Sequence, residues 1–235
     1  MFPTSPGLIE FIRPLVESGM SVVSTGGTAK ALVDAGIPVT NVSDQTGFPE
    51  VLDGRVKTLH PKIHMALLAR SFVDQDFSTL KKYEIEPFDL VVGNLYLFEN
   101  AVNQGKQGQE LIEFIDIGGP SFLRAAAKSF ERITTVVDPS DYGDVLQGLG
   151  KTIEGRRRLA AKVFSHTGSY DAMIAESLSQ GLSAPHVALG ESWFNLSDMG
   201  RTLSNKQIGT EPVVLPVEFI RRVFCKVNPS VITIS

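Results

Sequence analysis

The chain has 235 residues, 43% of them apolar, and a formal net charge of −4 at pH 7. Such a chain can bury a sizeable core, as one domain with an appendage or as two small domains. The negative charge gives no general reason to expect nucleic acid or an anionic membrane as a partner, and no apolar stretch approaches the roughly 18 to 20 residues that a membrane-spanning helix requires. The single cysteine, Cys225, excludes an intrachain disulfide and fits a reducing compartment.

The first residues, Met1 to Gly7, have neither a charged start nor an apolar core, so they do not resemble a signal peptide. The composition favours the cytoplasm. An organellar location stays open, because an incomplete start could have lost a transit segment.

A helix is predicted over residues 7–18, where apolar residues recur at helical spacing and Pro14 interrupts the pattern. A second helix is expected at residues 29–35. Short apolar runs predict strands, which cover residues 19–24, 36–42, 88–96 and 132–137. This alternation of helices and short strands predicts an α/β fold around a parallel sheet.

Polar and glycine-rich stretches stand at the carboxyl ends of predicted elements. They are residues 24–28, the loop around Gly54, residues 94–96 and residues 116–119. Because ligands of such folds bind beyond the carboxyl ends of parallel strands, we expect these stretches to converge on one site.

Residues 24–28 place two glycines and three hydroxyl groups between a strand and a helix. Free amides and hydroxyls at a helix start can cradle a phosphate without a lysine. The alternative is an ordinary tight turn in which Thr28 is the N-cap.

A second helix start follows Asp116 and two glycines, with Pro120 suited to the first helical position and Lys128 at the end of the run. The exposed amides of such a start attract an anion or a polar ligand group. Asp116 and Lys128 are the ionisable groups expected at that ligand. The alternative is that Asp116 caps the helix and Lys128 is a solvated lysine of its last turn.

A basic segment lies around Gly54 and Pro61, which favour a shaped loop over a helix. Its basic residues are Arg55, Lys57, His60, Lys62 and His64. Arginine and lysine next to Thr58 suit a phosphate or a carboxamide oxygen. A nucleic-acid loop is the weaker alternative, because interleaved aromatic residues are missing. No metal site is predicted, since Pro61 separates the two histidines and no carboxylate or thiol trio stands nearby.

Residues 156–171 predict a helix packed on the core, because Leu159, Val163 and Phe164 follow helical spacing. The first three residues of this segment are arginines and would form its solvated start. His166 is interpreted as a structural residue of the helix.

Six motifs occur in a fixed order along the chain. They are Thr25-Gly-Gly-Thr28, Gly47-Phe-Pro-Glu50, Gly54-Arg-Val-Lys-Thr-Leu-His-Pro61, Asn94-Leu-Tyr96, Ile115-Asp-Ile-Gly-Gly119 and Arg124-Ala-Ala-Ala-Lys128. In this order they resemble the IMP cyclohydrolase domain of the bifunctional purine biosynthesis family, whose second activity is AICAR transformylase. The resemblance runs from about Gly7 to Leu178.

The resemblance implies an α/β, methylglyoxal-synthase-like fold of three layers, with a mainly parallel sheet and helices on both faces. It also implies a reaction in purine biosynthesis. The carboxamide nitrogen of a formylated aminoimidazole-carboxamide ribotide (FAICAR) attacks the formamido group of the same molecule, and water is lost to give IMP. No cofactor is implied.

The resemblance further assigns roles to residues. Lys128 would exchange the proton that lets the oxygen leave as water, and Asp116 would orient or deprotonate the carboxamide nitrogen. Lys57 and Tyr96 would hold the formyl oxygen. The other substrate contacts would come from Thr25, Gly26, Gly27, Thr28, Arg55 and Thr58 at the phosphate and ribose, and from Asn94, Ile117 and Gly118 at the base.

The start of the chain departs from the family, which begins with an interior strand followed by Ser-x-Ser-Asp-Lys-Thr-Gly. Here Ser5 stands where the lysine would be. We therefore expect the first strand to be missing. A sheet without an interior strand would leave backbone groups of its neighbours unpaired and lose buried apolar side chains, so we also expect a damaged or less stable sheet.

The predicted division is a cyclohydrolase-like domain at residues 1–178 and a divergent, poorly ordered tail at residues 179–235. The family continues into a transformylase domain with an Arg-Tyr-Gly-Glu-Asn-Pro-His stretch, which this tail lacks. Transformylase activity and the dimer contacts of that domain are therefore not expected. A homodimer stays possible.

The favoured function is thus an IMP cyclohydrolase that binds a small purine nucleotide, FAICAR or IMP. Neither nucleic acid nor a membrane is expected as a partner. The alternative is an inactive purine-nucleotide-binding module or a truncated fragment. A regulatory fragment is a third hypothesis, since methylglyoxal-synthase-like folds also serve as effector-binding domains.

Overall fold

The structure is a computed structural model, and it describes residues 5–52, 54–95, 97–179 and 230–234. The chain separates into two compact units, Met1–Ala175 with Asn228–Ser235, and Glu176–Val227. Almost all of the second unit lies outside the described residues, so the fold below is that of the first unit.

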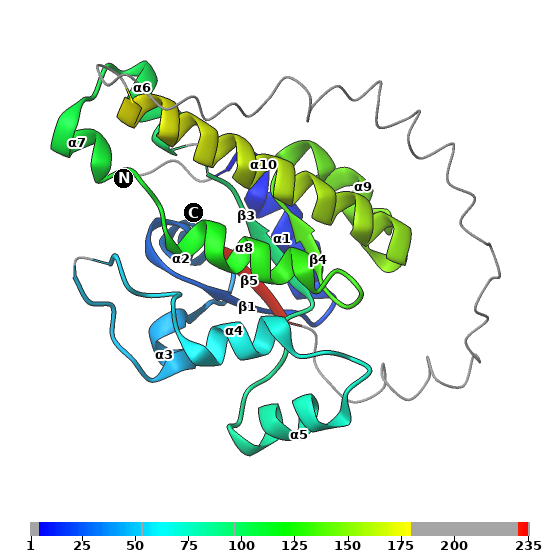
Figure 1. The fold of residues 1–235 in the computed structure, drawn as a ribbon. Helices are drawn as coiled ribbons and strands as arrows, with labels where there is room; N and C mark the ends of the chain where they lie inside the picture. Colours follow the sequence, from blue (N-terminus) through cyan, green and yellow to red (C-terminus); the bar gives the residue numbers. More distant parts are fainter. Residues whose placement is uncertain (1–4, 53, 96, 180–229, 235) are drawn as a thin grey trace, which may run out of the picture. The chain divides into compact units, whose positions relative to one another are not determined.

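A parallel sheet forms the middle of this unit (Figure 1). Its strands in the described residues are β1 (Ser21–Ser24), β2 (Thr40–Asn41), β3 (Leu90–Gly93), β4 (Thr134–Val136) and β5 (Ser230–Ile234). The spatial order is β2-β1-β5-β3-β4, and every pairing is parallel. The predicted strands are thus confirmed, although the run at residues 36–42 contributes only two strand residues.

Strand β5 lies between β1 and β3, in the interior of the sheet (Figure 1). Val231 is in register with Val22 on one side and with Leu90 on the other. Because β5 pairs along both edges, the backbone groups of β1 and β3 that face each other have partners. The expectation of a sheet damaged by a missing strand is therefore wrong: a strand from the far end of the sequence fills this interior position. The rest of the predicted tail lies outside the described residues.

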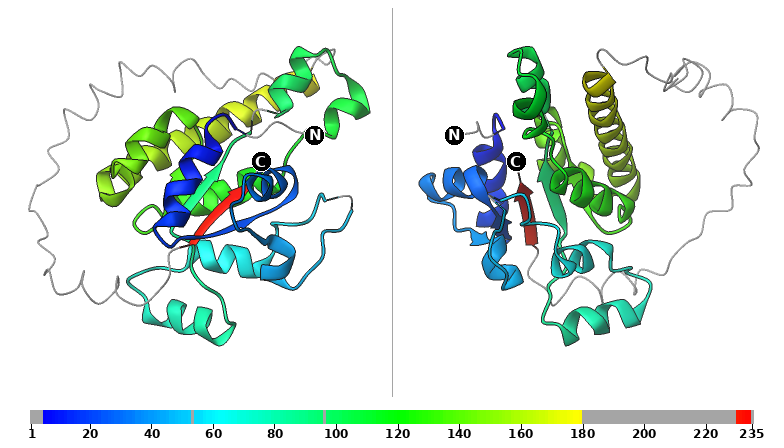
Figure 2. Two further views of the ribbon diagram at one scale, coloured as in Figure 1. Left: turned by 180° about the vertical axis from the view of Figure 1, so that it is seen from behind. Right: turned by 60° about the vertical axis from the view of Figure 1, so that its left-hand side comes forward.

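One face of the sheet is covered by helices α1 (Leu8–Glu17), α2 (Gly26–Asp34) and α9 (Tyr142–Leu146), as Figure 2 shows. Alternate strand residues point to this face, among them Val22, Leu90 and Val92. The Phe11 ring stacks on Tyr142 with their centroids 4.3 Å apart. Helix α1 continues through Pro14, as the sequence pattern predicted.

The opposite face packs against the larger core, to which Val23 and Val91 contribute. The helices on this side are α4 (Pro61–Leu68), α6 (Leu97–Asn103), α8 (Gly118–Lys128) and α10 (Ile153–Ser179). Shorter elements complete the unit: α3 (Val42–Thr46), α5 (Asp74–Lys82), α7 (Gly108–Ile112), η1 (Pro139–Asp141) and η2 (Leu149–Lys151). The predicted three-layer α/β arrangement is confirmed (Figure 2).

Two predictions for α10 are wrong. Arg156 is not part of a solvated start, because its guanidinium donates to the carbonyl oxygens of Phe130 (2.8 Å) and Gly150 (2.9 Å). Partial burial lowers the pKa of Arg156. Phe164, expected in the core, is 41% exposed, whereas Val163 is fully buried. The helical spacing predicted the helix correctly, but it wrongly included Phe164 in the buried face.

Among the residues that the structure describes, no helix has both the length and the apolar character needed to cross a membrane.

Candidate functional site

The predicted site segments meet at the carboxyl edge of the sheet, where α2 and α8 begin (Figure 1). They are the turn after β1, the loop before α4, the start of α8 and, through Leu95 alone, the loop after β3. In parallel sheets this edge collects the loops that follow each strand.

The turn after β1 begins α2 at Gly26, whose φ of 59° lies in the left-handed region that favours glycine. Thr25 is the N-cap residue, but its buried hydroxyl donates to Glu50 instead of capping the helix. Thr28 lies inside α2 and is buried. The alternative interpretation of Thr28 as the N-cap is therefore wrong.

Ser24, the last residue of β1, has a fully buried hydroxyl. In the part of the chain that the structure describes, its Oγ has no hydrogen-bond partner. Buried polar groups without partners are uncommon and costly. A ligand group at this edge could supply the missing partner.

Lys57 lies against the start of α2. A side-chain carbon built on Gly26 would lie 3.5 Å from Lys57 Nζ, so the ammonium group stands beside the exposed turn. The positive charge of Lys57 and the amides at a helix start both attract an anionic or electron-rich ligand group.

The next residue, Thr58, touches the start of α8. Its buried hydroxyl would lie 2.6 Å from a side-chain carbon on Gly118. At Gly119, such a carbon would overlap Asp116 Oδ2 and lie 2.9 Å from Leu95 Cδ2. Both positions need glycine because polar groups and Leu95 approach the backbone too closely for a Cβ.

Asp116 is tied to the helix that follows it. Its Oδ1 accepts from the amide of Gly119 (3.1 Å), and its own amide donates to the Tyr170 hydroxyl (2.7 Å). The interpretation of Asp116 as a helix cap is thus supported by a contact. Capping does not exclude chemistry, because a carboxylate can accept several further hydrogen bonds.

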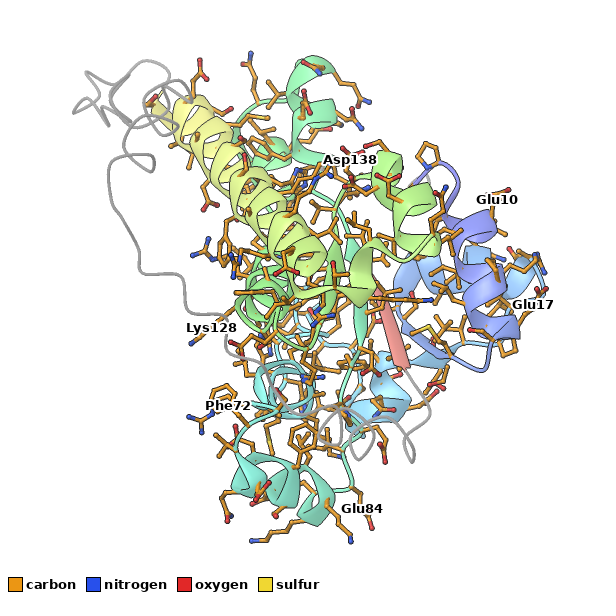
Figure 3. The ribbon with its side chains drawn as sticks, turned by 90° about the vertical axis from the view of Figure 1, so that its right-hand side faces the viewer. Glu10, Glu17, Phe72, Glu84, Lys128 and Asp138 are labelled. Atoms are coloured by element: carbon orange, nitrogen blue, oxygen red, sulfur yellow. The ribbon has the colours of Figure 1, made fainter. Side chains whose placement is uncertain are left out.

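Helix α8 begins at Gly118, so the prediction that Pro120 is its first residue is off by two positions. Lys128 is its last residue and is exposed. At a rise of about 1.5 Å per residue, about 15 Å of helix separates Gly118 from Lys128. Figure 3 shows the Lys128 side chain at the outer surface, pointing away from the body of the unit. The structure therefore does not bring Lys128 to Asp116 within one chain.

Asn94 faces a different space. Its side-chain amide donates to Ser5 Oγ (2.6 Å). Asn94 also lines a cavity of about 460 Å³, together with Asp138, Lys162 and His166. None of the residues at the starts of α2 and α8 lines this cavity. Tyr96, the remaining catalytic candidate, lies outside the described residues.

Two predicted contacts are exposed. Arg55 forms an ion pair with Glu113, next to the end of α7, and its side chain is 62% exposed. Ile117 is 63% exposed at the start of α8. Both could meet a ligand that enters from solvent, and neither is buried in the site.

The two histidines of the basic segment have local partners. His60 Nδ1 accepts from the Lys62 amide (3.2 Å), and His64 Nε2 lies 3.2 Å from Ser121 Oγ. Because α4 starts at Pro61, the prediction of a loop is wrong for the second half of this segment. In the described part of the chain, no group of three or more His, Cys, Asp or Glu residues could hold a metal ion.

Two residues of α10 reach the site loops, and sequence reasoning missed the role of both. His166 Nε2 accepts from the backbone amide of Leu95 (3.1 Å), and the Tyr170 hydroxyl accepts from that of Asp116 (2.7 Å). Their spacing of four residues places them on one helix face. This spacing was the sequence feature that could have indicated a shared role. Which loops they would meet could not be known without the fold.

The fold and the glycine-lined edge define a methylglyoxal-synthase-like domain, and the family description "MGS-like domain" matches residues 7–121. A second description, "AICARFT/IMPCHase bienzyme", matches residues 126–204. The resemblance that the motifs predicted is thus confirmed: residues 7–121 match one description and the following segment matches the other.

Individual relatives agree. The bifunctional purine biosynthesis protein PurH of Halalkalibacterium halodurans is 53% identical over 181 residues, which are 75% of this chain and 35% of the relative. PurH of Leuconostoc mesenteroides is 51% identical over 193 residues, 80% of this chain and 38% of the relative. The chain thus spans about a third of the length of these curated relatives. A crystal structure of ForH matches with a TM-score of 0.66 and 36% identity, over 74% of this chain and 95% of that one.

Proposed function

We propose that the chain is an IMP cyclohydrolase that closes the ring of FAICAR to give IMP and water. The observation that carries the proposal is the convergence of Lys57, Thr58 and Asp116 against the glycines that begin α2 and α8. The matching relatives are named as purine biosynthesis proteins, which supports a purine nucleotide as the substrate.

The reaction is intramolecular and needs no outside oxidant or reductant. The carboxamide nitrogen forms a bond to the formyl carbon, the formyl oxygen gains negative charge, and the nitrogen loses a proton. The oxygen then takes up two protons and leaves as water when its bond to carbon breaks, while the formamido nitrogen loses its own proton and forms a double bond to that carbon. A protein can accelerate this by holding the reacting atoms together, stabilising the oxygen and moving protons.

In this proposal the phosphate binds at the start of α2. Gly26, Gly27 and Thr28 offer backbone amides at a helix N-terminus, and the unpaired Ser24 hydroxyl stands at the end of the preceding strand. Arg55 would reach the phosphate by leaving Glu113. Such an exchange costs little, because solvent screens an exposed ion pair of this kind.

Lys57 and Asp116 do the chemistry. The Lys57 ammonium stabilises the oxyanion and is the proton donor when the oxygen leaves as water. Asp116 takes the proton of the attacking nitrogen through the part of its carboxylate that the Gly119 amide does not occupy. Lys128 is not given this role, because the length of α8 separates it from Asp116. Tyr96 remains a candidate for the formyl oxygen, and Asn94, Ile117 and Gly118 for the base.

A second function deserves a test because Asn94 faces Ser5 and a separate cavity. With Asn94 turned away from the base, the edge could bind a purine nucleotide without turnover. Such a module would keep the phosphate contacts and lose the near-attack geometry.

The deciding experiment measures IMP formation from FAICAR by the purified chain, with calorimetric titration of IMP in parallel. Lys57→Met is the informative variant, and Lys81→Met, on an exposed position of α5, is the matched control. Turnover that falls about 10²-fold or more in Lys57→Met alone supports the enzyme, in the range known for lost oxyanion donors. Binding of IMP without turnover by the parent chain would support the binding module instead.

We further propose that the chain acts in the cytoplasm on this small molecule, without nucleic acid or membrane partners.

A further inference from the structure

Helix α10 makes two hydrogen bonds to the loops that carry the proposed site. His166 Nε2 accepts from the amide of Leu95, in the loop after β3, at 3.1 Å. The Tyr170 hydroxyl accepts from the amide of Asp116, just before α8, at 2.7 Å. Because the two side chains are four residues apart, one face of one helix holds both loops.

The two loops also contact each other at Gly119. Leu95 Cδ2 lies 2.9 Å from the place where a Cβ of Gly119 would be, and the Gly119 amide donates to Asp116 Oδ1 at 3.1 Å. The contacts therefore form a closed ring that runs from His166 to Leu95, Gly119, Asp116 and Tyr170, and back along α10. A shift of either loop must move the Asp116 carboxylate or break a hydrogen bond.

We propose that His166 and Tyr170 are positioning residues that fix the Asp116 carboxylate for the ring closure by holding the backbone amides of Leu95 and Asp116. Neither residue is proposed to touch the substrate. The expected effect of these residues on the reaction rate rests on the proposed function. Their expected effect on the positions of the two loops rests on the hydrogen bonds alone.

His166 can accept from Leu95 only while Nε2 carries no proton. Burial lowers the pKa of His166, Lys162 on the same helix lowers it further, and Asp138 and Glu99 act in the opposite direction. Lys162 itself pairs with Asp138 (2.6 Å) and Asp141 (2.7 Å). His166 lines the cavity next to Asn94, so a proton from solvent can reach it.

The sign of the pH effect follows from this lowered pKa. The unfolded chain binds a proton near pH 6.5, while the folded chain binds it only at lower pH. The contact with Leu95 is therefore complete above pH 6.5, and it is lost as the pH falls through the pKa of the folded state. Activity should show an acid limb in this range.

Tyr170 is not expected to titrate in the same range. It is 4% exposed, and burial raises its pKa to about 12. Its hydroxyl therefore keeps its proton and can accept from Asp116. Replacement by phenylalanine would leave the Asp116 amide without this partner in a partly buried place.

The test compares His166→Gln with His166→Leu. A glutamine amide oxygen can take the place of Nε2 as acceptor and does not titrate, whereas leucine offers no acceptor. We expect His166→Gln to keep kcat within about threefold of the parent and to lose the acid limb, while His166→Leu lowers kcat about 10- to 100-fold with little change in KM. Tyr170→Phe should resemble His166→Leu. Tyr83→Phe, a change at a 52% exposed tyrosine, is the matched control.

Hydrogen exchange measures the loops independently of turnover. The amides of Leu95 and Asp116 should exchange faster in His166→Leu and Tyr170→Phe, while that of Val91, in β3, keeps its protection. An unchanged exchange rate and kcat in His166→Leu, or an acid limb that persists in His166→Gln, would overturn the inference. A parent chain that does not turn FAICAR over would refute the proposed function, and the exchange data would still decide whether α10 holds the two loops.

Discussion

The two ends of α8 differ sharply, although both carry residues of the family's motifs. At the amino end, Gly118 and Gly119 are crowded by Thr58, Leu95 and Asp116, and every close approach uses the space of a missing Cβ. At the carboxyl end, Lys128 is exposed at the outer surface (Figure 3). Lys128 stands twelve positions after Asp116 in the sequence, and the helix Gly118–Lys128 turns most of that interval into about 15 Å, which no side chain spans. We therefore propose that the chemistry takes place at the amino end.

The amino end lies at the sheet edge where β5 ends, so removing β5 is the severest test of this assignment. A chain without residues 230–235 should lose cooperative thermal unfolding and all turnover, because β1 and β3 would lose backbone partners in the interior of the sheet. Circular dichroism melts and IMP formation measure both effects. Ile232→Val, which keeps a β-branched residue, should stay close to the parent. A shortened chain that melts like the parent would show that the two strands do not depend on β5.

Asp116→Asn tests the carboxylate at the amino end with the least structural change. An asparagine oxygen can still accept from the Gly119 amide, so the unfolding temperature should stay near that of the parent. The loss of the base should lower kcat about 10² to 10⁴-fold. Asp34→Asn, at an exposed ion pair of α2, is the control and should leave kcat unchanged. A fall of less than about threefold in Asp116→Asn would remove the carboxylate from the mechanism.

Gly119→Ala asks whether the close approach itself matters. The added methyl would overlap Asp116 Oδ2 and press on Leu95, so kcat should fall about 10- to 100-fold, and stability by about 1 to 3 kcal/mol. Gly143→Ala, in α9, has open space around the added carbon and should be neutral or stabilising by up to about 1 kcal/mol. Equal effects of both substitutions on kcat and on urea unfolding would mean that Gly119 has no special role.

The sequence allowed most of the sheet and the glycine-rich starts of α2 and α8 to be predicted. Buried apolar runs mark β1, β3 and β4, and glycine-rich stretches mark the starts of α2 and α8, because local pattern and local structure coincide there. The position of β5 could not be predicted, since residues 231–235 were interpreted as part of a weakly patterned tail. The place of Ser230–Ile234 in the sheet depends on pairing with strands about 140 and 210 residues away.

Two of the predicted site residues, Lys128 and Asn94, do not lie beside Asp116, and the physical reason differs between them. The separation of Lys128 from Asp116 could have been predicted from the sequence, because the length of the predicted helix between them follows from its number of residues. The turn of Asn94 toward Ser5 and the reach of His166 to Leu95 depend on how α10 and the first residues pack, which no local pattern encodes.

The smallest effect is expected at the carboxyl end of α8. Lys128→Gln should keep kcat within about threefold, because the exposed ammonium group is about 15 Å of helix away from the start of α8. The measurement is the same IMP assay, beside Lys57→Met. A loss of 100-fold or more with unchanged unfolding would mean that a single chain does not contain the whole site. In that case a mixture of Lys57→Met and Lys128→Gln chains should regain activity, because a second copy would bring its own intact lysine to the first. Without such recovery, the distance along α8 would have to be shortened by a rearrangement of the helix itself.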